Sequence, residues 1–191
     1  MMFRIIVWIF TLGLNAVYAD TVHIAVAANF TQPVKTLKTR FEQATHHQLI
    51  ISLGSTGQLY AQIKNGAPYE VFLAADTKRP QLLVEEGEAV AESLVTYAVG
   101  KLILWSSKPD FVDNTVLKTG DFQYLALTNP KTAPYGAAAV QVLEKLGLWT
   151  SLQAKIVQGE NITQTYQFVV TQNAELGFVA LSQYQGGKHI G

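Results

Sequence analysis

Residues 49–63 read L-I-I-S-L-G-S-T-G-Q-L-Y-A-Q-I, which is an apolar run, a polar turn and a helical pattern in direct succession. The run 49–53 has the length and composition of a buried strand. Ser55 or Thr56 can cap the helix that follows, and apolar residues then recur at helical spacing until Gly66. The stretch is therefore a strand–turn–helix unit, and the chain around it repeats this unit.

The rest of the chain alternates in the same way. The predicted strands are 21–27, 49–53, 69–75, 124–128, 155–158 and 176–181. The predicted helices are 30–41, 56–65, 79–86, 137–146 and 162–172. Repeated strand–helix units predict an α/β protein with parallel-rich sheets, in which ligands bind at the carboxyl ends of the strands.

A longer apolar run, 94–107, has Gly100 near its middle. A long strand with a central glycine can leave one sheet and enter another, so the run predicts a boundary between two lobes, 20–98 and 99–191.

Helix starts and inward faces are predicted as well. Asn29 and Asp76 are expected to be helix caps, and the expected inward side chains are Phe30, Val34, Leu37 and Phe41 in one helix and Ile162, Tyr166, Val169 and Val170 in another.

Four polar segments lie between a predicted strand and a predicted helix. They are A-N-F-T at 28–31, G-S-T-G at 54–57, N-P-K-T-A-P-Y-G at 129–136 and G-E-N-I-T at 159–163. Each offers hydroxyl or amide groups and backbone N–H groups at a helix start, where unpaired donors and the helix dipole favour anions. Because Lys131 is the only cationic residue among them, they predict capture of a small oxyanion by neutral donors.

The first 19 residues have the pattern of a secretory signal. Arg4 precedes the apolar run 5–14, and V-Y-A at 17–19 presents small residues where a signal peptidase cuts, so cleavage after Ala19 and export are predicted. An uncleaved anchor is the alternative. Without Arg4, 13 of the 14 basic residues remain against 14 acidic ones, which argues against a nucleic-acid partner. The chain has no cysteine, so no disulfide can support the fold.

Six motifs in order resemble the periplasmic molybdate-binding proteins of ABC-type molybdate importers. They are A-V-A-A-N-F at 25–30, I-S-L-G-S-T-G-Q-L-Y-A-Q-I at 51–63, N-G-A-P-Y-E-V-F-L-A-A-D at 65–76, T-Y-A-V-G-K-L-I-L-W-S at 96–106, N-P-K-T-A-P-Y-G at 129–136 and L-G-F-V-A-L at 176–181. The resemblance covers essentially all of residues 20–191.

The resemblance implies a type II periplasmic binding protein, with two α/β lobes joined by crossing strands and an anion in the cleft between them. It implies that Asn29 and Thr56 contact the anion from the first lobe, with Ser55 beside them. It implies that Tyr135 and the backbone N–H of Ile162 contact it from the second. The expected protein is a monomer without a cofactor or catalytic activity that passes molybdate or tungstate from the periplasm to a membrane permease.

The resemblance also reveals a departure at the C-terminal end. Members of the family continue past the position of Gly191 with a second crossing strand and a helix that returns to the first lobe. By this comparison the chain is expected to be a fragment or a truncated product, with reduced stability and a looser hinge. A nonfunctional fragment is therefore one alternative function.

The residue types bear on which anion is bound. A tetrahedral dianion has no proton to donate and is suited by donors alone, whereas phosphate near neutral pH keeps a proton that a carboxylate would accept. Glu160 is the acidic residue nearest to the polar segments, and none is expected at the ligand. This pattern favours molybdate, tungstate or sulfate over phosphate, and the choice between molybdate and sulfate depends on cavity size, which the sequence does not give.

Other interpretations of the same residues are structural or catalytic. Asn29, Ser55 and Thr56 could be plain helix caps, and Tyr135 could be a packed loop aromatic. An enzyme is disfavoured because G-S-T-G lacks the G-x-S-x-G pattern of a serine nucleophile. No histidine lies near any of the other polar segments in the sequence, so the serine has no obvious base. The histidines have no metal-ligand spacing, so no metal ion is predicted at His23, His46, His47 or His189.

Overall fold

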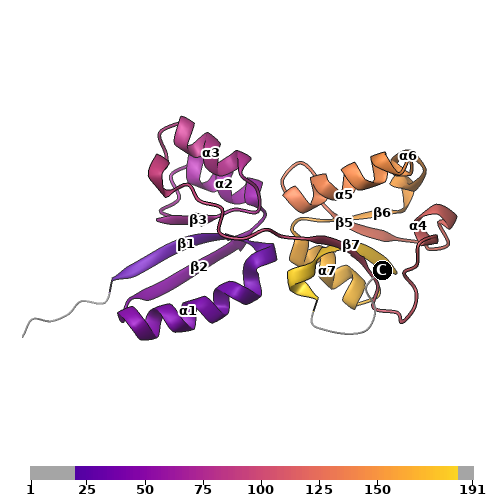
Figure 1. The fold of residues 1–191 in the computed structure, drawn as a ribbon, viewed down its shortest axis with the longest axis horizontal. Coiled ribbons are helices and arrows are strands. Elements are labelled where there is room, and N and C mark those ends of the chain that lie inside the picture. Colours follow the sequence, from indigo (N-terminus) through magenta and orange to yellow (C-terminus); the bar gives the residue numbers. More distant parts are fainter. Residues whose placement is uncertain (1–19, 185–191) are drawn as a thin grey trace, which may run out of the picture.

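The computed structural model describes residues 20–184, so the predicted signal segment 1–19 and the last residues, 185–191, lie outside it. Two sheets with their own helices lie side by side and form two lobes (Figure 1). Within residues 20–184, no helix has both the length and the apolar character needed to cross a membrane.

The first lobe is built on a three-stranded parallel sheet of order β2-β1-β3. Its strands are β1 (Thr21–Ala27), β2 (Gln48–Gly54) and β3 (Val71–Leu73). Its helices are α1 (Thr31–Thr45), α2 (Thr56–Lys64) and α3 (Lys78–Glu85), with α1 on the opposite side of the sheet from the other two (Figure 1). Parallel pairing brings the carboxyl ends of all three strands to the edge that faces the second lobe (Figure 1).

The second lobe is built on a four-stranded sheet of order β4-β7-β5-β6, in which β4 alone runs antiparallel to its neighbour. Its strands are β4 (Leu102–Trp105), β5 (Leu125–Thr128), β6 (Ile156–Gly159) and β7 (Leu176–Ala180). Its helices are α4 (Val116–Thr119), α5 (Pro134–Lys145), α6 (Trp149–Leu152) and α7 (Ile162–Val170).

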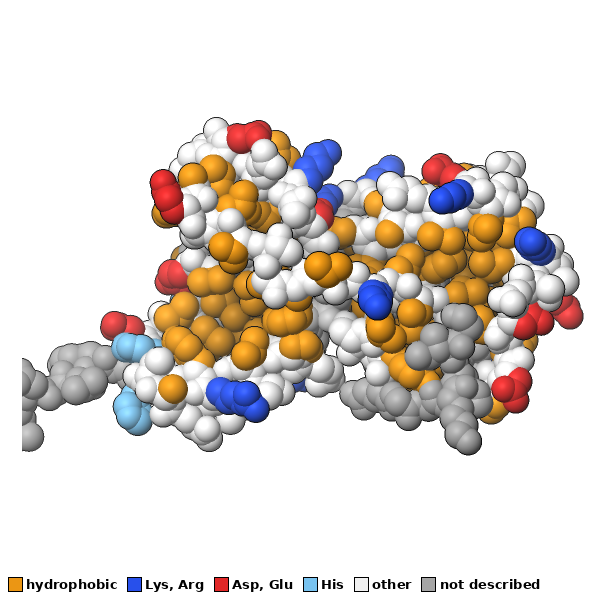
Figure 2. Space-filling view, viewed as in Figure 1, with side chains coloured by type: hydrophobic (Ala, Val, Ile, Leu, Met, Phe, Trp, Pro, Cys, Tyr) orange, Lys and Arg blue, Asp and Glu red, His pale blue; other side chains and the backbone are white. Residues whose placement is uncertain are grey.

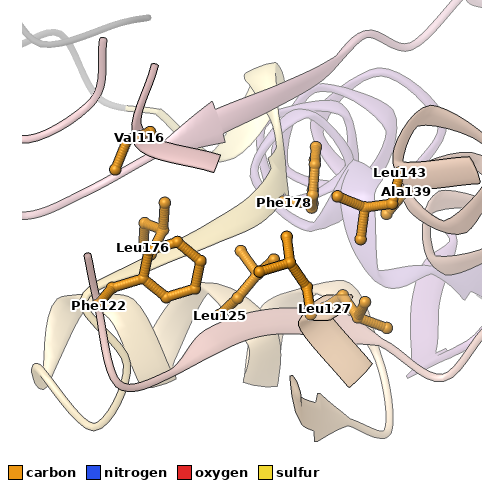
Figure 3. Packing of buried hydrophobic residues seen from close by; sticks show 9 residues of the cluster. Val116, Phe122, Leu125, Leu127, Ala139, Leu143, Leu176 and Phe178 are labelled. Atoms are coloured by element: carbon orange, nitrogen blue, oxygen red, sulfur yellow. The ribbon is translucent and has the colours of Figure 1, made fainter. Parts of the chain in front are cut away.

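The core of the second lobe lies between β5, β7 and α5. Figure 3 shows Leu125, Leu127 and Phe178 from the strands close to Ala139 and Leu143 from α5. Every residue of β5 and β7 is buried, because helices cover both faces of this sheet. The near-continuous apolar sequence of these strands follows from that double coverage.

The chain passes between the sheets through residues 94–101, which form no strand. The prediction of one long strand over 94–107 is therefore wrong, since only β4 (Leu102–Trp105) pairs with a neighbour. The residues before β4 are exposed and span the gap between the two sheets, where no strand lies beside them. The prediction for 69–75 is also too long, because only Val71–Leu73 pairs with β1.

Several predicted details of the helices are wrong. Asn29 is not a helix cap, because it lies within a 3₁₀ turn, Ala28–Phe30, and α1 begins after Phe30 without a side-chain cap. Leu37 is 49% exposed and Val170 is 41% exposed, so neither faces the core. The inward position in α7 is instead taken by Thr165, which shares a 2.8 Å hydrogen bond with Thr128 of β5. A polar pair inside the lobe could not be read from apolar spacing alone.

The first lobe leaves a broad apolar surface open. Figure 2 shows apolar side chains gathered between α1 and the helices α2 and α3. The large apolar side chains of this lobe that are more than 40% exposed include Leu37, Ile50, Leu53 and Val71. The first lobe therefore buries its strands less completely than the second.

Candidate functional site

The five residues predicted to contact an anion lie around one pocket between the lobes. Asn29, Ser55 and Thr56 reach it from the first lobe, and Tyr135 and Ile162 reach it from the second. The other residues that line it are Ala27, Ala28, Gly54, Ala75, Ala133 and Pro134. The space among these residues is about 210 Å³ when the solvent that opens onto it is included, so the enclosed part is smaller still. It can hold only a small solute.

The first-lobe side of the pocket is the start of α2. Ser55 is the N-cap of this helix, and it forms a capping box in which its Oγ accepts from the backbone N–H of Gln58. The hydroxyl oxygen of Thr56 accepts from the backbone N–H of Ala75 at 3.0 Å. Both side chains are almost completely buried. Since each hydroxyl is engaged here as an acceptor, its own hydrogen remains available to donate to a ligand.

The second-lobe side includes the start of α7. Asn161 is the N-cap, and its side-chain oxygen accepts from the backbone N–H groups of Thr163 at 3.0 Å and Gln164 at 3.1 Å. These bonds leave the N–H of Ile162, the first residue of the helix, uncapped. The side chain of Ile162 is buried against Ala28 and Ala180, so only the backbone N–H of this residue is available to the pocket.

Tyr135 lies at the second position of α5, after Pro134. Burial raises the pKa of the Tyr135 hydroxyl, and a hydrogen bond from the side chain of Asn29 opposes part of that rise. Burial, followed in importance by the nearby Tyr135, raises the pKa of Tyr97 to about 12. Tyr135 is therefore a neutral phenol at physiological pH and keeps a proton to donate.

The electrostatics of the pocket come from neutral groups, because none of its lining residues is charged. The side chain of Lys131 is exposed and lies outside the pocket lining. Glu160 accepts a 3.3 Å hydrogen bond from Gln58, also away from the lining. Nearby, Arg79 is held in an ion pair with Asp76, which also accepts the backbone N–H of Arg79 at 3.0 Å, as a capping residue would.

Hydrogen bonds join the lobes around the pocket. The backbone N–H of Gly57 donates to the carbonyl of Thr132 at 2.8 Å, and the Arg79 guanidinium donates to the carbonyl of Lys131 at 3.2 Å. We call these two contacts the interlobe bridge. A further bond between the lobes is the one that Ser182 donates to the carbonyl of Asn29 at 2.6 Å. The structure is therefore a closed arrangement of the two lobes.

Sequence reasoning missed part of this arrangement. It did not identify Ala75 as a pocket residue or Gly57 as a contact between the lobes. The sequence does contain a signal for Ala75, because Ala27, Gly54 and Ala75 are all small residues at or just after the ends of β1, β2 and β3. Small residues at those ends leave room for a ligand. The contact made by Gly57 depends on how the lobes meet, and no local sequence pattern encodes that.

Residues 20–184 contain no group of three His, Cys, Asp or Glu side chains that could hold a metal ion. The predicted absence of a metal at His189 concerns a residue outside the described range. The arrangement around the pocket is thus a set of uncharged hydrogen-bond donors that two lobes hold around a small space.

Comparison with known proteins supports one family. Residues 22–190 match the model of the bacterial extracellular solute-binding protein family. The molybdate-binding protein ModA of Azotobacter vinelandii is 58% identical over 179 residues, which are 92% of this chain and 71% of that protein. The ModA protein of Rhodobacter capsulatus is 52% identical over 170 residues, 88% of this chain and 67% of that protein.

A solved structure agrees with these sequence matches. The periplasmic molybdate-binding protein of Azotobacter vinelandii superposes with a TM-score of 0.84 at 43% identity, covering 88% of this chain and 77% of that one. The predicted fold class, a two-lobed α/β periplasmic binding protein, is therefore confirmed. The chain belongs to the bacterial extracellular solute-binding proteins and, within them, to the family of the molybdate-binding ModA proteins.

Proposed function

We propose that this protein captures molybdate or tungstate in the pocket between its lobes and delivers the anion to the membrane permease of an ABC importer. The observation that carries the proposal is the convergence of the five predicted residues on one uncharged pocket. The names of its relatives support the same ligand, since both ModA proteins are described as molybdate-binding.

Asn29, Ser55 and Thr56 donate to the anion from the first lobe. Tyr135 and the backbone N–H of Ile162 donate from the second. Such donors stabilise a negative charge without a cationic side chain, because the helix starts that present them carry partial positive charge. The two capped helix starts at α2 and α7 supply this field from opposite sides of the pocket.

The absence of a carboxylate from the pocket lining supports discrimination against phosphate. A protonated phosphate oxygen would bring its own donor toward a set of donors, with no acceptor to receive it. Sulfate is the second candidate ligand, because it is also a fully ionised tetrahedral dianion. Molybdate and tungstate are larger than sulfate, so the space between the lobes decides between them.

The remaining parts of the proposal concern location and partners. The protein is exported by the signal segment 1–19, divides into lobes 20–98 and 99–191, and works as a monomer in the periplasm. It has no catalytic role, since the pocket lining contains no histidine, lysine or acidic residue to act as a base for Ser55.

Isothermal titration calorimetry of the chain from Asp20 to Gly191 tests the proposal. Molybdate, tungstate, sulfate and phosphate are titrated separately under identical buffer and salt conditions. We expect heats of binding for molybdate and tungstate, weaker binding of sulfate and much weaker binding of phosphate. Equal affinity for phosphate and molybdate, or no binding of any of the four, would show that the proposed function is wrong.

A further inference from the structure

The segment that connects the lobes lies directly against the Tyr135 hydroxyl. A Cβ atom placed on Gly100 would lie 2.0 Å from the hydroxyl oxygen of Tyr135 and 3.1 Å from the ring carbon that carries it. Non-bonded atoms cannot approach to 2.0 Å, so no side chain at position 100 is compatible with the observed position of that hydroxyl. The backbone of Gly100 has no positive φ, and conformation alone does not require glycine here.

The same segment is fastened to the first lobe beside the pocket. The hydroxyl of Tyr97 donates to the carbonyl of Ala74 at 2.8 Å, and Ala74 precedes the pocket residue Ala75. The ring of Tyr97 packs edge-on against Phe30 with 5.1 Å between centroids, and Phe30 follows the pocket residue Asn29. The segment is therefore held against the first lobe on one side and against Tyr135 on the other.

We propose that Gly100 positions the Tyr135 hydroxyl for the anion. Because Gly100 has no side chain, this hydroxyl can lie against the connecting segment, where Tyr135 also contacts Asn29 and lines the pocket. The inference rests on the proposed function, because Tyr135 must be an anion donor for its position to matter. By this proposal, affinity for the anion depends on a residue of the segment that connects the lobes as well as on the residues that line the pocket.

A different role for the same glycine makes a different prediction. If Gly100 served as a flexible hinge, a Cβ there would act through the backbone and would be indifferent to the identity of residue 135. If it serves to admit the hydroxyl, the harm done by a Cβ disappears once the hydroxyl is removed. In Tyr135→Phe the nearest remaining atom is the ring carbon at 3.1 Å, which a shift of a few tenths of an ångström relieves.

The test is a double-mutant cycle for molybdate affinity with Gly100→Ala, Tyr135→Phe and the combined variant. Each single variant is expected to raise Kd roughly 10- to 150-fold, the loss of one hydrogen bond to a charged group. The double variant is expected to lie within about twofold of Tyr135→Phe, the precision to which independent effects add. Val99→Ala is the matched control, since Val99 is in the same segment and 86% exposed, and its Kd should equal that of wild type.

Two outcomes of this cycle would overturn the inference. One is an unchanged Kd in Gly100→Ala, and the other is an equal loss from Gly100→Ala in both backgrounds, as a hinge would give. The cycle is repeated on urea unfolding without anion, where Gly100→Ala should destabilise the wild-type protein more than it destabilises the Tyr135→Phe variant. Additive unfolding effects would likewise refute the contact.

The two proposals fail separately. Failure of wild type to bind any of the four anions would contradict the proposed function, whereas the unfolding cycle would still show whether Gly100 accommodates the Tyr135 hydroxyl. Binding by wild type together with additive effects in both cycles would leave the proposed function intact and remove Gly100 from it.

Discussion

The side chain of Asn29, from the first lobe, donates a hydrogen bond to the hydroxyl of Tyr135, from the second. Two residues proposed to bind one anion are thus also bonded to each other across the pocket. An anion that takes both donors replaces this bond, so its binding gains the difference between the new contacts and the old one. The exchange is favourable because hydrogen bonds to a charged acceptor are stronger than those between neutral groups.

Replacing Asn29 by alanine should weaken molybdate binding by about 1.5–3 kcal/mol, roughly 10- to 150-fold in Kd, because one donor to a charged group is lost. Lys131→Ala is the control, since the Lys131 side chain is outside the pocket lining and only its carbonyl serves the interlobe bridge. Calorimetry of both variants decides the matter. A larger loss for Lys131→Ala would mean that long-range charge, not neutral donation, governs affinity.

Thr56→Ala should reduce both binding and stability. The Thr56 hydroxyl is buried and accepts from the backbone N–H of Ala75, so its removal leaves that donor without a partner. The cost to the free energy of unfolding is about 1–3 kcal/mol, in addition to the loss of an anion donor. Urea unfolding without ligand measures the first effect and calorimetry the second. Unchanged unfolding would show that water replaces the hydroxyl at Ala75.

Gly57→Ala should hinder closure of the lobes. A Cβ on Gly57 would lie 2.8 Å from the carbonyl oxygen and 3.0 Å from the Cα of Thr132, and backbone atoms cannot move aside as a flexible side chain does. The variant should remain more open with molybdate than wild type does, with a larger radius of gyration in small-angle X-ray scattering and a higher Kd. Ala61→Ser, at an exposed position of the same helix, should behave as wild type. Normal closure of Gly57→Ala would show that the lobes meet differently in solution.

Alkaline pH should destabilise the protein through Tyr97. Although 41% of Tyr97 is exposed, its hydroxyl is partly buried where it donates to the carbonyl of Ala74, and this burial raises its pKa from 10.0 to about 12 because it disfavours the phenolate. The folded pKa lies above the unfolded one, so stability is unaffected below pH 10 and is lost as pH rises from 10 through 12. Urea unfolding at about pH 8 and about pH 11, on either side of the ordinary tyrosine pKa, should show a smaller loss in Tyr97→Phe than in wild type. An identical loss in both proteins would exclude Tyr97 as the cause.

The sequence predicted the strands well where both faces are buried. Leu125–Thr128 and Leu176–Ala180 agree with prediction to within one residue, because continuous apolar runs bounded by polar residues are typical of central parallel strands. The prediction failed at 94–101, where an equally apolar run crosses between the lobes. Composition alone does not distinguish a paired strand from an extended crossing, since the difference lies in which neighbour is beside it.

The residues predicted to bind an anion line one pocket, but the geometry of that pocket was not predictable from the sequence. Helix starts and the family motifs identified Ser55, Thr56 and Ile162, and the structure places all three around one pocket. The 3₁₀ turn at Asn29 and its bond to Tyr135 were not predicted, because both depend on contacts between residues more than one hundred positions apart. Contacts of that kind arise only when the two lobes meet.

The division of the donors between two lobes has a consequence for how the anion leaves. When the lobes separate, each half keeps only part of the donor set, and water reaches the ion from the open side. Release then needs no proton, no competing ion and no chemical change in the protein, because separating the lobes moves the donors of one lobe out of hydrogen-bond reach of the anion. A permease that pulls the lobes apart would thereby lower the affinity for the anion at the moment the pocket faces the membrane. The work done in separating the lobes would then determine how readily the anion is released at the entrance to the channel.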